Sequence, residues 1–447
     1  MSIRAILAGL VVGLVAAFIY FLPGSPPPPP QPPVPEAVAA PDASVAAPKV
    51  AVAEPESAPV PETVNFAEGF CSESGGESVV LHFTLEKLLS AQLVERIDSG
   101  AAGPDTDVMT AWVQGAKPEA LLEEAKKAEQ ALPNSPWPKV AAAIALHSLG
   151  QNEQRVEKLR DLRKLLPDDP AVAMALADAT RDAPDLDEAI DGLSVYLKHE
   201  AAPALSRLRA RLEVQRDIQK EYRRSSRGGI TLLWPEGSLT PSQADELLAA
   251  IDRGLDDAAA FTATRRRDHL TAVVYPSRSE LLAVSCVRNW TAALYDGVLR
   301  TVAVPNDAGV DLKVLRHETL HAQLSPLAPL APKWFHEGVA QAFAQERLPK
   351  RAWKQMVNNK VWIPFSSLDG SFQVFANGAD ADLAYAQSYA MAELMREKTG
   401  DRAVSSALVA FQSGADTPTA FAKACGEPEV TGDELLRSIE QRLDRER

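Results

Sequence analysis

Two histidines and a glutamate near residue 320 have the types and the spacing that metal-assisted hydrolysis requires. In the segment Arg316-His317-Glu318-Thr319-Leu320-His321 the two imidazoles are four residues apart. On a helix, residues at this spacing share one face, so His317 and His321 could bind the same cation. Glu318 would lie beside them and could take a proton from a water molecule at the cation. We therefore expect a metal-dependent hydrolase.

A hydrolytic metal site also needs a third protein ligand and one open position. The helix that carries the histidines is predicted to span residues 311–324 and to end at a proline-rich break. A second helix is predicted to begin at about Lys333, and it carries His336 and Glu337. Both side chains are ordinary zinc donors, so the residue types alone leave the choice between them open.

The second helix resembles a motif of a known peptidase family. The segment that begins at Pro332 resembles the second-helix motif of the gluzincins, which are the thermolysin-like metallopeptidases of the MA clan. The matching residues are Pro332, Trp334, Glu337-Gly338 and Ala340. The resemblance implies one catalytic Zn²⁺ that is held by His317, His321 and Glu337. It makes His336 a neighbour of the site, and it implies that Glu318 serves as general base and then as general acid. It covers roughly residues 229–447.

The same resemblance implies roles for two further residues, Gln341 and Tyr385. Gluzincins often carry an acidic residue four positions after the ligand glutamate, where it orients a zinc-bound histidine. Gln341 stands at this position, and its carbonyl could accept the same hydrogen bond more weakly. Tyr385 matches the tyrosine that relatives in the aminopeptidase branch place opposite the zinc, where its phenol could stabilise an oxyanion. Packing on a helix face is the alternative role for Tyr385 and for Tyr389.

Strand and helix patterns alternate around the motif, which predicts a small α+β domain over residues 216–447. The resemblance implies that this is a gluzincin-like metallopeptidase domain. Ile230–Trp234 and His269–Val274 have the composition of strands, and Thr240-Pro241 is a typical helix start. Asp296-Gly297 between apolar runs predicts a β-hairpin. In the gluzincin picture the strand that runs to Val304 borders the cleft, and a peptide substrate would pair with it in extended form.

Further helices are expected on both sides of this region. A charged helix is predicted just before the first strand, and closing helices are predicted at the end of the chain: 206–224, 404–411, 418–424 and 433–447.

Residues 107–215 have a helical pattern that repeats. The segment Leu132–Pro136 recurs as Leu166–Pro170, 34 residues later. A period of this length with a proline closing each unit resembles the tetratricopeptide repeat, in which paired helices stack into an all-α solenoid. The resemblance implies a surface that could bind a protein partner. A packed helical spacer is the alternative.

The N-terminus predicts a membrane attachment. After Arg4, the apolar run Ala5–Leu22 is long enough to span a bilayer as a helix, so residues 1–22 are expected to be a signal-anchor. A cleaved signal peptide is the alternative. Residues 23–62 are rich in proline and alanine and predict a disordered linker, whereas residues 63–106 give no clear assignment. The bulk of the chain would lie on the exported, periplasmic or extracytoplasmic side.

Composition excludes one broad class and leaves the redox state open. The 447-residue chain has a formal net charge of −14, so it lacks the positive charge of a nucleic-acid binder. The one basic run, Arg265–Arg267, is interpreted as a solvated turn before a strand. Cys71, Cys286 and Cys425 are too few and too widely spaced to define a disulfide framework or a cysteine zinc site.

Together these features predict a membrane-anchored, exported zinc metallopeptidase that hydrolyses peptide bonds. Its partners would be a peptide or protein substrate, the membrane, and a protein on the helical repeats. The first alternative is a repeat scaffold or binding protein whose metal domain is structural or catalytically weak. The second alternative keeps the hydrolase but changes the substrate to another amide on the exported side, such as a peptidoglycan peptide.

Overall fold

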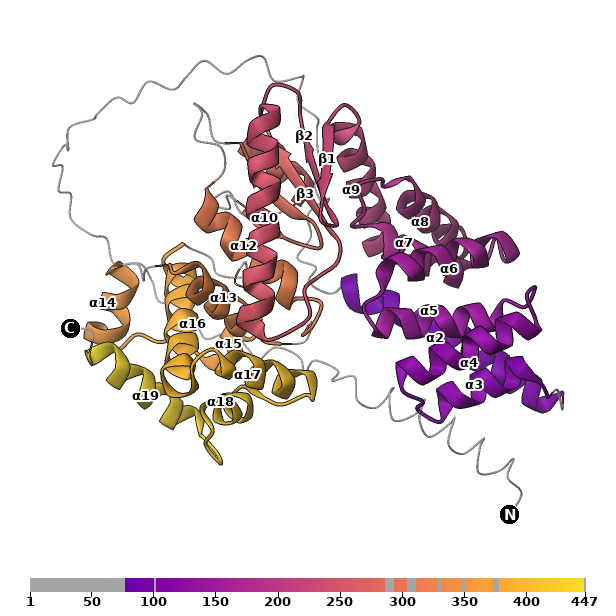
Figure 1. The fold of residues 1–447 in the computed structure, drawn as a ribbon. Helices are drawn as coiled ribbons and strands as arrows, with labels where there is room; N and C mark the ends of the chain where they lie inside the picture. The colour runs from indigo at the N-terminus through magenta and orange to yellow at the C-terminus, as the bar shows by residue number, and fades with distance from the viewer. Residues whose placement is uncertain are drawn as a thin grey trace, which may run out of the picture. The chain divides into compact units, whose positions relative to one another are not determined.

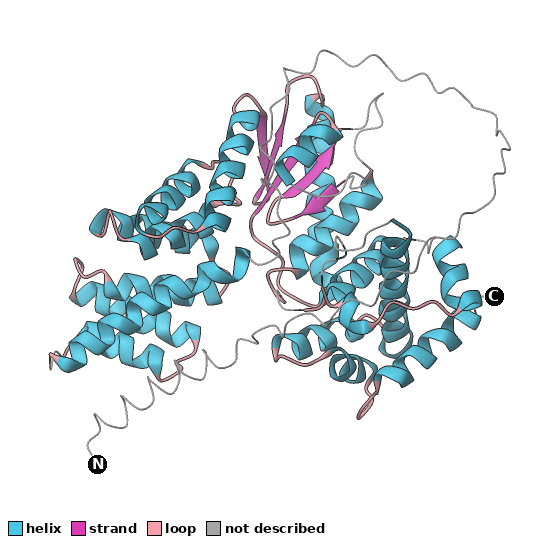
Figure 2. Cartoon of the chain, turned by 180° about the vertical axis from the view of Figure 1, so that it is seen from behind, coloured by secondary structure: helices cyan, strands magenta, loops and turns pink. Residues whose placement is uncertain are grey.

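The chain folds into a mainly helical structure with one small mixed sheet (Figure 1), and Figure 2 shows the same fold from behind. The structure is a computed structural model that describes residues 77–99, 102–285, 293–303, 311–328, 331–346, 350–370, 372 and 378–445. The predicted signal-anchor at 1–22 and linker at 23–62 lie outside these ranges. Of the helices within them, none combines the length and the apolar character needed to cross a membrane.

The region of the predicted repeats consists of consecutive helices that pack against one another. They are α3 (Pro104–Val113), α4 (Pro118–Ala131), α5 (Trp137–Ser148), α6 (Asn152–Leu165), α7 (Pro170–Thr180), α8 (Asp187–His199) and α9 (Pro203–Gln219). Helices α5, α7 and α9 begin at residues 137, 170 and 203, close to the predicted period. A proline in the first turn favours these helix starts. At α7, the Asp169 side chain also accepts hydrogen bonds from two backbone amides of the helix.

Part of the segment that the sequence left unassigned is a long helix. Helix α2 (Glu77–Asp98) packs against α3, α5 and α7. Its residues Leu85, Leu89 and Leu93 recur at one-turn spacing and are buried in the core of the repeats. These three leucines explain why α2 lies along this face of the helical array.

The sheet has the strand order β1-β2-β3-β5-β4. Its strands are β1 (Arg223–Arg227), β2 (Ile230–Trp234), β3 (Leu270–Tyr275), β4 (Ala293–Tyr295) and β5 (Leu299–Val302). Strands β2, β3 and β5 are parallel, whereas β1 and β4 run antiparallel at the two edges. The hairpin predicted at Asp296-Gly297 is confirmed, because this turn joins β4 to β5.

The charged helix predicted over residues 206–224 is too long at its C-terminal end. Helix α9 ends at Gln219, and Arg223–Arg227 form the edge strand β1. The reason lies in Gly228 and Gly229, whose φ angles of 56° and 84° allow the tight turn that pairs β1 with β2. The arginines and serines of β1 suit an exposed edge strand.

Helices cover both faces of the sheet. On one face, β2 residues such as Leu232 pack with α10 (Pro241–Thr262) and with Leu315 of α12 (Leu312–Leu324). On the other face, Leu233 packs with α11 (Arg278–Ser285) and with Val214 and Ile218 of α9. Alternate residues of a strand point to opposite faces, which is why neighbours on β2 join different cores. Helix α9 therefore belongs both to the repeats and to the layer that covers the sheet.

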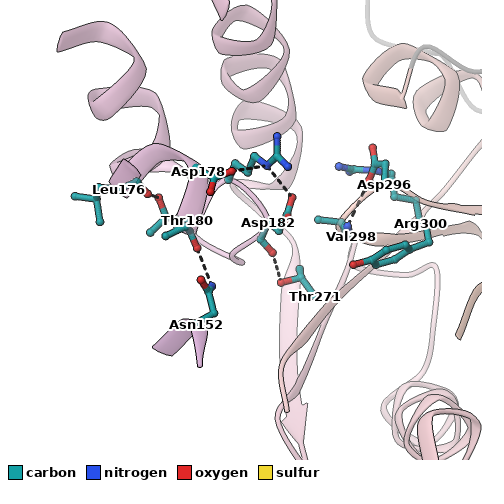
Figure 3. A network of polar contacts seen from close by, with 12 residues as sticks. Asn152, Leu176, Asp178, Thr180, Asp182, Thr271, Asp296, Val298 and Arg300 are labelled. Carbon is teal, nitrogen blue, oxygen red and sulfur yellow. Dashed lines mark hydrogen bonds and ion pairs between the residues drawn. The ribbon is translucent and has the colours of Figure 1, made fainter. Parts of the chain in front are cut away.

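Polar contacts also join the repeats to the sheet (Figure 3). The Thr271 hydroxyl on β3 donates a hydrogen bond of 2.6 Å to the backbone carbonyl of Asp182, just after α7. The same aspartate leaves no room for a side chain at Gly297, where a Cβ would lie 2.3 Å from a carboxylate oxygen. Next to Gly297, Asp296 forms a 2.9 Å ion pair with the buried Arg300. The end of α7 thus contacts the β4–β5 hairpin directly.

The remaining helices form a separate apolar core behind α12. They are α13 (Lys333–Ala344), α14 (Lys350–Asn359), α15 (Phe365–Leu368), α16 (Gly378–Thr399), α17 (Arg402–Gln412), α18 (Thr417–Cys425) and α19 (Gly432–Arg445). The last three match the predicted closing helices within a few residues. Cys425 is buried in α18, whereas Cys71 and Cys286 lie outside the described residues.

Helices α13 and α16 approach each other so closely that only glycine fits between them. A Cβ on Gly338 would lie 2.1 Å from the backbone carbonyl oxygen of Ser388. Alanine normally stabilises a helix interior relative to glycine by about 1 kcal/mol. We expect Gly338→Ala instead to lower the free energy of unfolding by about 1–3 kcal/mol, because two backbones must move apart.

Urea unfolding of the variant measures this effect, and Gly370→Ala is the matched control. Gly370 has no atom within 4 Å of its would-be Cβ, so its replacement should change stability by less than about 0.5 kcal/mol. Equal stability of the Gly338 variant and the parent would contradict the close packing.

Candidate metal centre

Helix α12 is fixed at its start and along both sides. The Asp311 side chain caps it by accepting hydrogen bonds from the amides of Lys313 and Val314. Leu315 packs toward the sheet and Leu320 toward the helical core, so the helix lies between the two cores. Leu312, in the first turn of α12, is 63 % exposed.

The two helices bring three metal donors together. The Nε2 atoms of His317 and His321 are 3.0 Å apart. Glu337 Oε2 lies 3.3 Å from the Nε2 atom of His317 and 3.5 Å from that of His321. All three donor atoms lie within 4.8 Å of one another and could hold a metal ion. Two imidazoles and a carboxylate are a donor set that suits zinc, so the residues fit the metal that the sequence predicts.

His336 does not join this cluster. Its Nε2 atom lies 3.1 Å from the carbonyl oxygen of Ala328, to which it donates a hydrogen bond as a neutral imidazole. Burial, with the positive charges of His321 and Lys333, lowers the pKa of His336 to about 3. The choice that the residue types left open is therefore made by geometry, and Glu337 is the residue that faces the histidines.

The carboxylate that orients His317 comes from a residue that the sequence analysis missed. Glu346 Oε1 lies 2.7 Å from His317 Nδ1, so the Nδ1–H donates to Glu346 and Nε2 is the ring nitrogen that faces the other donors. Gln341, the expected position, has a buried Oε1 atom without a hydrogen-bond partner among the described residues. Glu346 follows Gln345, which ends α13 in a left-handed conformation and turns the chain back toward α12.

The charges around the cluster favour a bound cation. Burial disfavours a charged imidazole, yet the carboxylates of Glu337 and Glu346 raise the pKa of His317 to about 10. Burial also opposes ionisation of Glu337, but Lys333 and His321 hold its pKa well below the usual range. The Glu337 carboxylate therefore stays negative and attracts positive charge.

Glu318 and Tyr385 lie within electrostatic reach of the cluster. Glu318 is 7 % exposed, and burial raises its pKa while the neighbouring histidines partly offset this effect. The negative charge of Glu337 and then burial raise the pKa of Tyr385 well above its usual value, with further contributions from Glu318 and Glu346. The Tyr385 ring also packs edge-on against Phe372, with 5.2 Å between ring centroids.

The basic run is more than a solvated turn. It does precede a strand, β3, but Arg267 is half-buried and donates a hydrogen bond of 3.1 Å to the carbonyl of Ala322, next to His321. The same guanidinium contacts the Tyr295 hydroxyl on β4. Gln323 accepts a hydrogen bond of 2.9 Å from the Arg267 amide. These contacts fasten the C-terminal half of α12 to the edge of the sheet.

Two comparisons with known proteins place the chain in no family. No protein-family model matches it, and no curated protein matches it significantly. The likeness to gluzincins therefore remains a resemblance, and the function has to be argued from the donor cluster itself.

Replacing Glu346 tests its contact with His317. We expect Glu346→Gln to weaken zinc binding by roughly 10–100-fold, because an amide is a weaker acceptor for the Nδ1–H and orients the ring less firmly. Titration with zinc against a chelator of known affinity measures the change.

Glu129→Gln is the control for this variant. Glu129 is also partly buried, and it pairs with Lys158 at 2.7 Å in the helical region before the sheet, where no change in zinc affinity is expected. Parental zinc affinity in the Glu346 variant would show that the contact does not support the site.

Proposed function

We propose that this protein is a zinc-dependent peptidase whose metal is held by His317, His321 and Glu337. The observation that carries the proposal is the cluster of these three donors within 4.8 Å, with the buried carboxyl of Glu318 beside them. A purely structural zinc site has no need of a fourth, free carboxyl group next to its ligands. The resemblance of both helix motifs to those of gluzincins supports the same conclusion.

Glu318 and Tyr385 carry the proton and charge steps of the proposed reaction. Bound zinc would polarise the scissile carbonyl group and make a water molecule more acidic. Glu318 accepts a proton from the attacking water and passes it to the departing amine. Its raised pKa brings the carboxyl closer to the range in which it can both accept and return a proton. The Tyr385 hydroxyl donates a hydrogen bond to the oxyanion as it forms.

The expectation that the strand running to Val304 borders the cleft is wrong, because this strand, β5, pairs with β3 on one side and with β4 on the other. Strand β4 is instead the proposed binding edge for an extended peptide. It is the last strand of the sheet, and it packs against α12, which carries two of the ligands. A peptide that pairs with a sheet edge is held by main-chain hydrogen bonds, so its side chains stay available for selection. The contact of Arg267 with Tyr295 and α12 supports this role, because it fixes the strand relative to the metal helix.

The remaining parts of the proposal rest on the sequence. Residues 1–22 would anchor the chain in a membrane, and the catalytic domain would act on the exported side. The helical repeats would bind a protein partner. Stoichiometric zinc without hydrolysis of unfolded proteins would instead favour a scaffold with a structural metal. Hydrolysis confined to peptidoglycan peptides would favour a hydrolase that acts on these peptides and not on proteins in general.

The decisive variant is Glu318→Gln. It keeps the size of the side chain but cannot accept the proton, so peptide hydrolysis should fall by roughly 10²–10⁴-fold or below detection. Its zinc content should remain equal to that of the parent, because Glu318 is not a ligand. Casein and peptide-library digestion, with metal analysis of the same samples, measure both quantities. A variant that cleaves as well as the parent would remove Glu318 from the mechanism.

Tyr385→Phe tests the oxyanion donor, and Tyr389→Phe is its matched control one turn further along α16. Loss of the Tyr385 hydroxyl should lower kcat by about 10²–10³-fold with little change in KM, because the hydrogen bond forms only in the transition state. Tyr389→Phe should retain most of the activity. Equal kcat values for the two variants would assign Tyr385 a packing role.

A further inference from the structure

Lys333 forms an ion pair with one of the metal ligands. Its Nζ atom lies 2.6 Å from Oε1 of Glu337. The other carboxylate oxygen, Oε2, is the atom that lies near the Nε2 atoms of His317 and His321. The two oxygens of Glu337 are therefore divided between an ammonium group and the metal-donor cluster.

Helix stability does not explain this lysine. Lys333 is the first residue of α13, where a positive charge opposes the helix dipole. In a helix, a lysine four residues before a glutamate is also the less favourable order for an ion pair. Glu337 is only 5 % exposed, so the pair is not an ordinary surface ion pair either. Lys333 compensates the buried charge of Glu337, and the same ion pair leaves only Oε2 of Glu337 facing the histidines.

We propose that Lys333 is a positioning residue that restricts Glu337 to one donor oxygen at the metal centre. The inference rests on the proposed zinc site, and it assigns a role to a residue outside the ligand set. With Oε1 held by the ammonium group, only Oε2 can bind the cation, so the protein supplies three donor atoms and leaves a position open for substrate or water. The charge of Lys333 also lowers the affinity of the site for a divalent cation.

Removing the ammonium group should change the coordination in a measurable way. In Lys333→Met both oxygens of Glu337 become available and the repelling charge is gone. Both effects favour the cation, so zinc should bind roughly tenfold or more tightly. The extra donor would occupy part of the open coordination sphere, and peptide hydrolysis should fall. Lys333→Arg keeps the charge and the hydrogen-bond donors, and should retain the parental affinity within about twofold.

The experiment uses the full chain and two probes, Zn²⁺ and Co²⁺. Zinc affinity is measured by competition with a chelator, and the visible absorption of bound Co²⁺ reports its coordination number without any need for turnover. The control is Lys164→Met, which removes an exposed lysine paired at 3.0 Å with Asp161 in the repeats. Thermal melting of the metal-free variants checks that each one is folded. We expect the Lys333 variants to fold, because the Lys333 side chain is 39 % exposed.

The outcomes separate this inference from the proposed function. Tighter zinc and a weaker, higher-coordination Co²⁺ spectrum in Lys333→Met, with parental behaviour in Lys333→Arg and Lys164→Met, support the inference. An unchanged spectrum and affinity in Lys333→Met, or a loss of metal binding, would overturn it while the zinc site of the parent stands. A parent chain that binds neither cation would overturn both the inference and the proposed function.

Discussion

The architecture around the candidate site depends on one buried carboxylate. Glu337 is almost completely removed from solvent, and an unpaired charge in that position would be strongly destabilising. Lys333, His317 and His321 surround it and hold its pKa low. These partners come from two helices, so α12 and α13 must keep a fixed separation for the charge to remain compensated. A bound cation would strengthen this arrangement, since it would bring positive charge to the same carboxylate.

The separation of the two helices is set by packing on their outer sides. Gly338 lets α13 rest against the backbone of α16, and the Trp334 indole donates a 3.0 Å hydrogen bond to the Thr417 hydroxyl. On α12, Thr319 follows Glu318 and packs against Gly254 of α10, where a larger residue would collide with it. Two glycines and one hydrogen-bonded indole thus fix the helices that carry the donors.

The spacing of residues along the chain made the metal donors predictable from the sequence. The contacts that support these donors could not be predicted in the same way. The four-residue interval of His317 and His321 is a property of any helix, and Asp296-Gly297 specifies a tight turn whatever surrounds it. Glu346 reaches His317 only because Gln345 reverses the chain at the end of α13, and this conformation depends on tertiary packing. Strand β1 was missed for a similar reason, since its arginines and serines carry no apolar alternation and pair only because two glycines turn the chain.

The shared helix α9 changes how the predicted division of the chain is understood. The predicted boundary at residue 216 falls inside this helix, which ends at Gln219. Val214 and Ile218 on either side of the boundary cover one face of the sheet, while Leu205 and Leu208 pack into the repeats. Together with the contact of Asp182 with Gly297, this makes the repeats part of the support of the β4–β5 hairpin. A protein that bound and shifted the last repeat would therefore act on the same edge that is proposed to hold the substrate.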